Sequence, residues 1–291
     1  MQVQPDQVPL DQARAYCESL AKTHYENFPV GRFVPKKIRP HIHAIYAFAR
    51  TADDFADEAQ HEGHRLERLA AWRQLLYDAA AGKADQPIFI ALSQAIREHQ
   101  IPLEWLDHLI QAFESDVKNN RHETFADLLA YSNLSANPVG RLVLWLHGYR
   151  DPKMLALSDH ICTALQLANF WQDVAIDWRK DRVYLPQSEL KKVGYTEAML
   201  AGSESNEAFR RTMADLIKRT RAIFQQGKPL CDRVDGRLKL ELRLVWSGGS
   251  RILEKIEAVN YDVFRRRPVI KAGDQALLLY RSLFWKREHE V

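Results

Sequence analysis

The hydrophobic residues of this chain recur every three or four positions along most of its length, which is the spacing of amphipathic helices. No stretch alternates strictly between apolar and polar residues, as a half-buried β-strand would. The pattern predicts helices over residues 9–24, 40–58, 65–81, 88–99, 103–115, 125–147, 152–178, 207–226, 238–258 and 274–287. We therefore expect an all-α fold in one domain, residues 1–291, with its helices packed around an interior cavity.

Breaks in this pattern contain glycine, proline or runs of polar residues. Pro138 and Gly140 lie inside the apolar helix expected over 125–147, so we expect a kink or a close approach of the backbone there. His61 and His64 lie in a hydrophilic loop, and we do not expect them to bind a metal.

Two of the predicted helices carry a line of polar side chains on an otherwise apolar surface. The first line comprises Tyr46, Arg50, Asp53 and Asp57, at positions i, i+4, i+7 and i+11. The second comprises Gln166, Asn169, Asp173 and Asp177, at positions i, i+3, i+7 and i+11. These spacings place each set on one helix face. Because a solvated face does not usually embed its acids among apolar residues, we expect both sets to face the cavity.

Each line contains an Asp-x-x-x-Asp pair, Asp53/Asp57 and Asp173/Asp177. If the two pairs face each other, they form a cluster of oxygen ligands suited to Mg²⁺. This ion binds one or two carboxylates and takes its other ligands from water and substrate phosphate. Either pair alone is equally compatible with an ordinary surface salt bridge. The presence of two such pairs on apolar helices favours the metal site.

The composition narrows the possible function classes. Of the 291 residues, 46% are hydrophobic and 27% are charged, which is ordinary for a globular protein with a buried core. The net charge of +3 does not indicate a nucleic-acid partner. Cys17, Cys162 and Cys231 have no metal-ligand spacing and suggest no disulfide framework, which suits a reducing compartment. The chain shows no signal-peptide pattern and no membrane-spanning apolar run, so we expect a cytoplasmic protein.

The predicted metal cluster suits a substrate with a diphosphate group, because Mg²⁺ neutralises a leaving diphosphate. Candidates for charge-assisted hydrogen bonds to the same group are Arg50, Arg182, Tyr184 and Arg265. Aromatic faces in the remaining wall would stabilise a carbocation, and a dry pocket would delay its capture by water. No Ser-His-Asp or Cys-His arrangement is evident. The residues therefore favour metal-triggered ionisation of an isoprenoid diphosphate.

Three motifs carry a resemblance to a known family. They are F-A-R-T-A-D-D-F-A-D-E at Phe48–Glu58, Q-L-A-N-F-W-Q-D-V-A-I-D at Gln166–Asp177, and R-V-Y-L-P at Arg182–Pro186. The chain resembles the squalene/phytoene synthases, which are class I isoprenoid synthases with an all-α helical bundle. The resemblance implies that both acidic motifs bind the substrate diphosphate through two or three Mg²⁺ ions. The implied metal ligands are Asp53, Asp57, Asn169, Asp173 and Asp177. Asp54 ranks lower, because it points about 100° away from Asp53 on a helix.

The resemblance also implies roles around the reacting carbons and the diphosphate. Residues that match diphosphate-holding positions are Arg50, Arg182 and Tyr184. Residues that match positions lining the site near the reacting carbons are Phe28, Tyr46 and Tyr131. Gln166 matches a polar position facing the cavity, and Arg265 belongs to a basic run that could close over the phosphate. Phe28 and Tyr131 are also compatible with a purely structural role, and the basic run with a solvated surface.

Further motifs resemble the hydroxysqualene synthase branch of the family. They are E-N-F-P-V at Glu26–Val30, N-P-V-G-R-L-V-L at Asn137–Leu144 and Y-D-V-F-R-R-R-P at Tyr261–Pro268. This branch ionises presqualene diphosphate, rearranges the cation and lets water capture it as hydroxysqualene, so no NADPH is expected. Two alternatives remain open. One is head-to-head condensation of two prenyl diphosphates, and the other is a catalytically silent relative that serves in assembly or binding.

The apolar substrate suggests peripheral contact with the inner face of a membrane. The basic side chains that could touch anionic lipid are those of Arg265–Arg267, Lys286 and Arg287. A soluble basic surface explains the same residues equally well. The sequence leaves the oligomeric state open.

Overall fold

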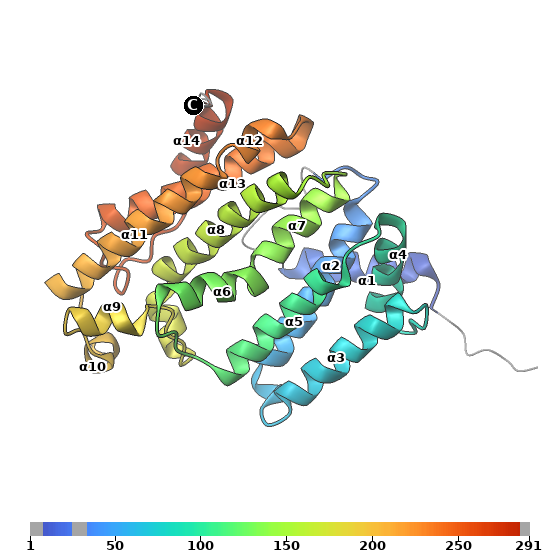
Figure 1. Cartoon of the computed structure of the whole chain (residues 1–291), viewed down its shortest axis with the longest axis horizontal. Coiled ribbons are helices and arrows are strands. Elements are labelled where there is room, and N and C mark those ends of the chain that lie inside the picture. The colour runs from blue at the N-terminus through green and yellow to red at the C-terminus, as the bar shows by residue number, and fades with distance from the viewer. Residues whose placement is uncertain (1–7, 25–33, 286–291) are drawn as a thin grey trace, which may run out of the picture. The chain divides into compact units, whose positions relative to one another are not determined.

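The computed structural model describes residues 8–24 and 34–285, and every regular element within them is helical (Figure 1). The described residues contain one isolated β-bridge, between Arg121 and Val183. The predicted all-α fold is confirmed. The helices group into two compact units. The first comprises residues 1–118 and 141–150, and the second comprises residues 119–140 and 151–291. The prediction of a single domain stays a prediction.

The first unit is built on helix α2. Its elements are α1 (Leu10–His24), α2 (Arg39–Asp57), η1 (Ala59–His61, a 3₁₀ helix), α3 (Arg65–Ala80), α4 (Pro87–His99) and α5 (Leu103–Lys118). Helix α2 begins with Pro40 in its first turn and contacts α1, α3, α4 and α5. The ring centroid of its Phe48 lies 5.9 Å from Trp72 and 6.1 Å from Phe89. This aromatic packing fixes the helix that carries the first Asp-x-x-x-Asp pair.

The second unit is built on helix α8. Its elements are α6 (Phe125–Ser135), α8 (Pro152–Arg179), α9 (Gln187–Lys192), α10 (Glu197–Ala201), α11 (Glu207–Gly227), α12 (Leu230–Arg233), α13 (Gly236–Ala258) and α14 (Ala272–Leu283). Helix α8 contacts α6, α11, α12 and α13. In the core, the Trp171 indole N–H of α8 donates a hydrogen bond of 2.9 Å to the Thr220 hydroxyl of α11. The second Asp-x-x-x-Asp pair is therefore carried by a helix with packed neighbours.

Two helices replace the single helix expected over 125–147. Helix α6 ends at Ser135, and α7 (Asn137–Leu146) begins after Ala136. Gly140 lies against Ser158 and Cys162 of α8, where an added Cβ atom would collide with both side chains. The interruption and the close backbone approach predicted from Pro138 and Gly140 are both confirmed. The boundary between the two units falls directly after Gly140, inside α7.

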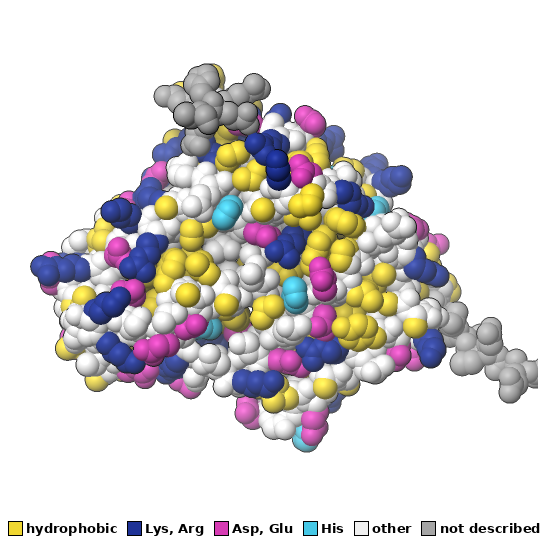
Figure 2. Space-filling model, viewed as in Figure 1, with side chains coloured by type: hydrophobic (Ala, Val, Ile, Leu, Met, Phe, Trp, Pro, Cys, Tyr) yellow, Lys and Arg dark blue, Asp and Glu magenta, His cyan; other side chains and the backbone are white. Residues whose placement is uncertain are grey.

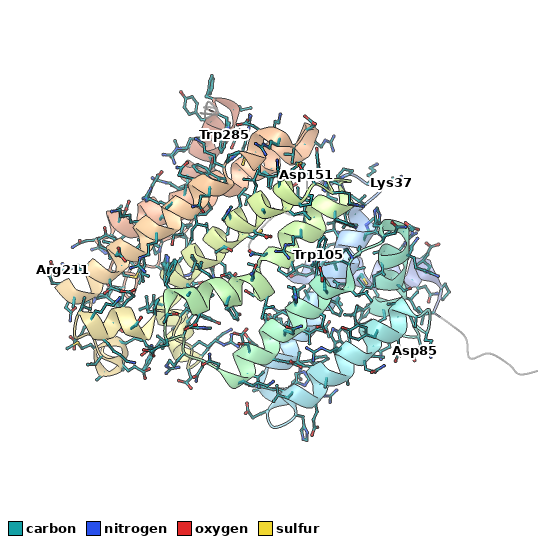
Figure 3. All side chains as sticks on the ribbon, viewed as in Figure 1. Lys37, Asp85, Trp105, Asp151, Arg211 and Trp285 are labelled. Carbon is teal, nitrogen blue, oxygen red and sulfur yellow. The ribbon has the colours of Figure 1, made fainter. Side chains whose placement is uncertain are left out.

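Basic and acidic side chains are interspersed over the face shown in Figure 2. Helix α14 and the residue that follows it differ, because they place large apolar side chains at the surface. The apolar group is Leu279, Tyr280, Leu283 and Phe284, with exposed fractions of 47%, 59%, 63% and 68%. The helix ends at Leu283 rather than at 287 as predicted. The chain then turns, and the indole of Trp285, whose position is labelled in Figure 3, donates a hydrogen bond of 3.2 Å to Asp232.

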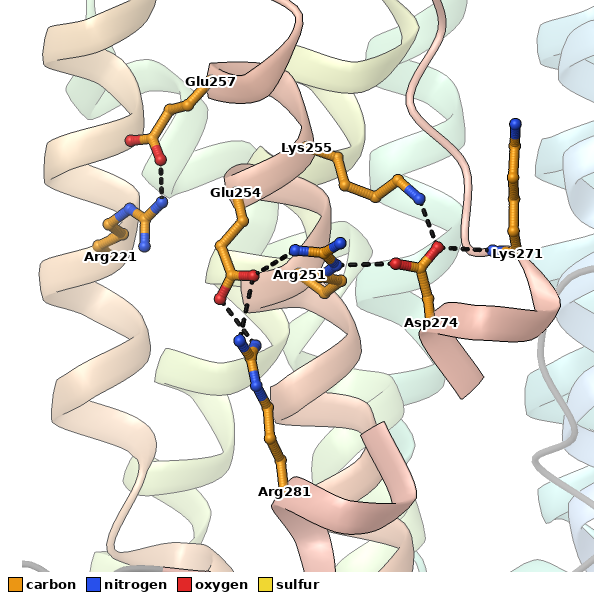
Figure 4. A network of polar contacts seen from close by, with 8 residues as sticks. All are labelled: Arg221, Arg251, Glu254, Lys255, Glu257, Lys271, Asp274 and Arg281. Carbon is orange, nitrogen blue, oxygen red and sulfur yellow. Dashed lines mark hydrogen bonds and ion pairs between the residues drawn. The ribbon is translucent and has the colours of Figure 1, made fainter. Parts of the chain in front are cut away.

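An ion-pair network joins α14 to α13 (Figure 4). Asp274 binds Lys255 and accepts a hydrogen bond of 2.8 Å from Arg251 Nε. Glu254 accepts one of 2.7 Å from Arg281 Nη1. The hydrogen bond from Lys255 is the largest of the influences that hold the pKa of Asp274 well below its usual range. Asp274 is buried, so this pairing compensates a charge that would otherwise destabilise the unit.

Candidate active site

The first acidic motif lies on the last turns of α2. Arg50 Nη1 lies 3.2 Å from Asp53 Oδ2, and Arg50 Nη2 lies 2.5 Å from Asp54 Oδ1. Asp54 therefore shares the guanidinium of Arg50 with Asp53, and its lower rank as a metal ligand stays a prediction. Residues at i+3 and i+4 are both neighbours of residue i on a helix, so one arginine reaches both carboxylates. Asp57 is the last residue of the helix and is half-buried.

Charges in this motif influence one another. Burial opposes the charged form of Arg50, but Asp53 and Asp54 outweigh it and raise the pKa of the guanidinium. Burial also raises the pKa of the Tyr46 hydroxyl, and the same two carboxylates add to that effect. Tyr46, Arg50 and Asp53, which the sequence placed on one helix face, therefore form one electrostatic group.

The second acidic motif lies on α8, and an arginine from another part of the chain binds it. Arg267 Nε donates to Asp173 Oδ1 at 2.5 Å, and Arg267 Nη2 donates to Asp173 Oδ2 at 3.2 Å. Two parallel hydrogen bonds of this kind are the strongest arrangement between arginine and a carboxylate. They raise the pKa of Arg267 against the effect of burial, and Asp177 adds to the rise. Arg267 therefore lies close to both acids of the pair.

Arg267 was not among the predicted site residues. The sequence singled out Arg265 from the same basic run, but its side chain is exposed and its backbone N–H lies 3.4 Å from Asp262 Oδ1. The prediction that Arg265 contacts the diphosphate stays a prediction. Three consecutive arginines give no sequence signal that distinguishes one of them. The distinction comes from the following segment, where Gln172 of α8 donates to the Pro268 carbonyl at 2.5 Å and fixes the register.

The R-V-Y-L-P segment folds back onto the second motif. The Arg182 backbone N–H donates to the Asp177 carbonyl at 2.9 Å. The Tyr184 ring stacks on Phe170 of α8, with a centroid distance of 3.8 Å and an interplanar angle of 9°. Asp177, Arg182, Tyr184 and Phe170 line one small pocket together with Val174. The second unit therefore brings together three of the predicted residues that are separated by a helix end.

Aromatic rings extend this group. The Tyr131 ring of α6 lies 5.9 Å from Tyr184 and 6.0 Å from Phe170. His122, which the sequence did not single out, stacks on Tyr184 at 5.6 Å and is 4% exposed. Burial lowers the pKa of the His122 imidazole, and its Nε2 has no hydrogen-bond partner among the described residues. The polar run N-N-R-H-E around His122 resembles a surface loop, so only the folded chain shows its burial.

For the remaining predicted residues, the structure gives fewer contacts or none. Gln166 is half-buried and Asn169 is exposed, both on α8 before Asp173. Phe28 lies outside the described residues. The two acidic motifs belong to different units, so the meeting of the two carboxylate pairs stays a prediction.

Both motifs offer the donors that Mg²⁺ binds. Carboxylate and amide oxygens are hard ligands, and Asn169 adds such an oxygen to the aspartates of α8. Each motif also holds a positively charged side chain, since Arg50 forms an ion pair with Asp53 and Arg267 forms one with Asp173. The donor set fits the predicted metal, and the binding of Mg²⁺ stays a prediction.

Residues 20–274 match the sequence profile of a family described as squalene/phytoene synthase. The chain belongs to the squalene/phytoene synthase family. This places it among enzymes that act on prenyl diphosphates. The family match covers both acidic motifs and the R-V-Y-L-P segment, so the resemblance proposed from those motifs is confirmed.

Relatives and solved structures agree with this assignment. The chain is 35% identical over 242 residues to a hydroxysqualene synthase of Rhodopseudomonas palustris, covering 81% of each protein. It is 29% identical over 280 residues to a 15-cis-phytoene synthase of Synechococcus elongatus, covering 90% of this chain and 89% of that one. It is also similar to the crystal structure of the squalene synthase HpnC from Alicyclobacillus acidocaldarius, with a TM-score of 0.83 and 38% identity over 87% of this chain and 97% of that chain.

Proposed function

We propose that this family member ionises presqualene diphosphate with Mg²⁺ and lets water capture the rearranged carbocation, giving hydroxysqualene and diphosphate. The observation that carries the reaction class is the pair of Asp-x-x-x-Asp motifs, each with an arginine on its carboxylates. The similarity to a hydroxysqualene synthase supports the choice of substrate and product. The branch motifs, including Asn137–Leu144 and Tyr261–Pro268, support the same choice.

The polar residues would bind the diphosphate, through Mg²⁺ and through direct hydrogen bonds. Those that would hold Mg²⁺ are Asp53, Asp57, Asn169, Asp173 and Asp177. The bound ion supplies positive charge to the leaving group. Arg50, Arg182 and Arg267 would donate hydrogen bonds to the diphosphate oxygens. Before substrate binds, Arg267 neutralises Asp173, and a diphosphate would offer the guanidinium a second anion of higher charge.

The aromatic residues would stabilise the carbocation. Phe170, Tyr184 and Tyr131 form a packed group beside the second motif. Their faces carry the negative side of the ring quadrupole, which attracts a cation without reacting with it. Close packing also keeps bulk water away while the cation rearranges. Capture by a single water at the end adds its oxygen to the carbon and releases one proton.

The second candidate is head-to-head condensation of two prenyl diphosphates to presqualene diphosphate, squalene or a phytoene-type product. The similarity to a 15-cis-phytoene synthase over most of both chains favours it. The same aspartates and arginines would serve, because each condensation also begins with loss of diphosphate. The two candidates therefore differ in the substrate rather than in the charged residues.

A product assay separates the candidates. Purified full-length protein with Mg²⁺ receives either presqualene diphosphate or farnesyl diphosphate, each with and without NADPH, and the products are identified by mass spectrometry. We expect hydroxysqualene from presqualene diphosphate, in equal yield with and without NADPH. Presqualene diphosphate or a squalene-type product from farnesyl diphosphate would instead assign the condensation. The absence of turnover with every prenyl diphosphate tried would point to the catalytically silent relative.

We also propose peripheral contact with a membrane that holds the apolar substrate. None of the helices in the described ranges is long and apolar enough to cross a bilayer. The surface that favours contact is the apolar group of α14 at Leu279, Tyr280, Leu283 and Phe284. Lys286 and Arg287, which lie outside the described residues, add basic charge shortly after this group in the sequence, and such charge attracts anionic lipid. Co-sedimentation with anionic vesicles should fall when Leu283 and Phe284 are both replaced by serine.

A further inference from the structure

Three potential metal ligands lie close together in the first unit, away from the acidic motif of α2. His41 lies in the first turn of α2, and Glu98 and His99 lie in the last turn of α4. His41 Nε2 is 3.2 Å from Glu98 Oε2, and the centroids of the two imidazole rings are 4.7 Å apart. One donor atom from each of the three residues lies within 4.8 Å of the other two.

We propose that His41, Glu98 and His99 form a binding site for a divalent transition metal, with Zn²⁺ as its natural occupant. Two imidazoles and one glutamate are an established donor set for this ion, with a fourth position left for water. Donor atoms around tetrahedral zinc lie roughly 3.3 Å apart. His41 Nε2 and Glu98 Oε2 already lie 3.2 Å apart, so only His99 needs to move in, by at most about 1.5 Å. The half-buried His99 can make this movement, while the buried His41 stays fixed.

The glutamate is held in place by neighbouring side chains. Gln94 Nε2 donates to Glu98 Oε1 at 2.5 Å, which leaves Oε2 directed toward His41. Arg14 Nη2 in turn donates to Gln94 Oε1 at 2.8 Å and fixes the amide. Such outer hydrogen bonds orient metal ligands and strengthen binding. They distinguish this group from a carboxylate that contacts a histidine by chance.

The charges around the site select the kind of metal. The positive charge of Arg14 helps to lower the pKa of His41, and those of Arg150 and Lys37 help to lower the pKa of His99. Positive charge therefore lies near both imidazoles. This charge opposes ions such as Mg²⁺, whose binding to oxygen donors is mainly electrostatic. Zn²⁺ forms strong bonds to imidazole nitrogen and tolerates such surroundings better. A bound metal would join the beginning of α2 to the end of α4.

Zinc titration of the untagged, full-length protein tests the site. Isothermal titration calorimetry with ZnCl₂ is performed in excess Mg²⁺, which occupies the carboxylate pairs. We expect one tight site per chain in the wild type, and an affinity at least tenfold weaker in both His99→Ala and Glu98→Gln. His64→Ala is the matched control, because His64 Nδ1 lies 2.9 Å from Glu67 Oε2 and no third metal ligand joins them among the described residues. Its affinity should equal that of the wild type.

Spectroscopy with Co²⁺ gives a readout that does not depend on affinity alone. Co²⁺ in place of Zn²⁺ should give visible absorption typical of nitrogen and oxygen ligands in a tetrahedral site, and His99→Ala should remove it. Circular dichroism of the metal-free variants checks that they fold. Equal zinc binding by the wild type, His99→Ala and Glu98→Gln would overturn the proposal, as would the absence of a tight site in the wild type.

Discussion

The two Asp-x-x-x-Asp motifs share a spacing but differ in the source of their positive charge. On α2 the arginine comes from the same helix, where Arg50 reaches Asp53 and Asp54 across one turn. On α8 it comes from 94 residues further along the chain, where Arg267 forms two hydrogen bonds with Asp173. The first arrangement is encoded locally, whereas the second requires the folded unit. Equivalent charge pairs can therefore arise by two routes in one protein.

The largest effect should come from removing one carboxylate from either motif. Asp53→Asn and Asp173→Asn should each lower the rate of diphosphate release from presqualene diphosphate by roughly 10²–10³-fold, the size typical for loss of one electrostatic contact in an active site. The exposed Asp85→Asn is the control and should match the wild-type rate. Circular dichroism should show all three variants folded. A near-native rate in either motif variant would remove that motif from the site.

Metal binding should distinguish the motifs next. A ligand present at a hundred times its Kd stabilises a protein by about 2.7 kcal/mol, so Mg²⁺ should raise the melting temperature. Arg267 holds Asp173 with two hydrogen bonds, whereas Arg50 approaches Asp53 with one nitrogen at 3.2 Å. We therefore expect Asp53→Asn to reduce the effect of Mg²⁺ alone more than Asp173→Asn does. Adding diphosphate should make the two variants alike, since it draws Arg267 away. A melting curve unchanged by Mg²⁺, with and without diphosphate, would argue against the metal cluster.

The arginine supplied from the distant segment should matter by its geometry as well as its charge. Arg267→Lys keeps the charge but loses the paired hydrogen bonds, and we expect roughly a tenfold loss in kcat/KM. Arg266→Lys is the matched control, because Arg266 is an exposed neighbour whose side chain forms no hydrogen bond or ion pair with the described residues. Equal rates for the two variants would show that the contact with Asp173 has no part in turnover.

The smallest effect should appear in the pH dependence of stability. The aromatic group beside the second motif contains the buried His122, whereas that beside α2 has Phe48, Trp72 and Phe89. Burial lowers the folded-state pKa of His122 below its unfolded value of about 6.5, although Asp127 acts in the opposite direction. The unfolded chain therefore binds more protons as pH falls below about 6.5, and the folded state loses stability.

His122→Phe removes this titration while keeping an aromatic ring. Between pH 7 and pH 5, urea unfolding should show the wild type losing more stability than the variant. Other buried histidines, such as His41 and His43, contribute equally to both proteins and cancel in the difference. Parallel curves for the two proteins would contradict this role of His122.

Local patterns were enough to predict much of the fold. The limits of α1, α4, α8 and α11 agree with the hydrophobic spacing within one or two residues, because apolar residues recur at helical spacing along the whole of each helix. The short helices α9, α10 and α12 were not predicted, since a helix of four to six residues shows barely one repeat of the pattern. The grouping of Tyr46, Arg50 and Asp53 followed from helical spacing alone.

What the sequence could not provide are contacts between distant segments. Arg267 and His122 acquire their surroundings from α8 and from the segment after it, and neither lies in a periodic pattern. The contact of Arg50 with Asp54 was also not predicted, because helical spacing gives the direction of a side chain and not the reach of an arginine. The prediction from periodicity therefore succeeds for backbone elements and fails where long side chains meet.

The order of segments along the chain has a consequence for synthesis and for dissection of the protein. Neither unit is continuous, since residues 119–140 belong to the second unit and 141–150 return to the first. A nascent chain can complete the first unit only after residue 150 has left the ribosome, while residues 119–140 must wait for α8 and the helices beyond it. No single cut therefore divides the chain into two fragments that each contain one whole unit.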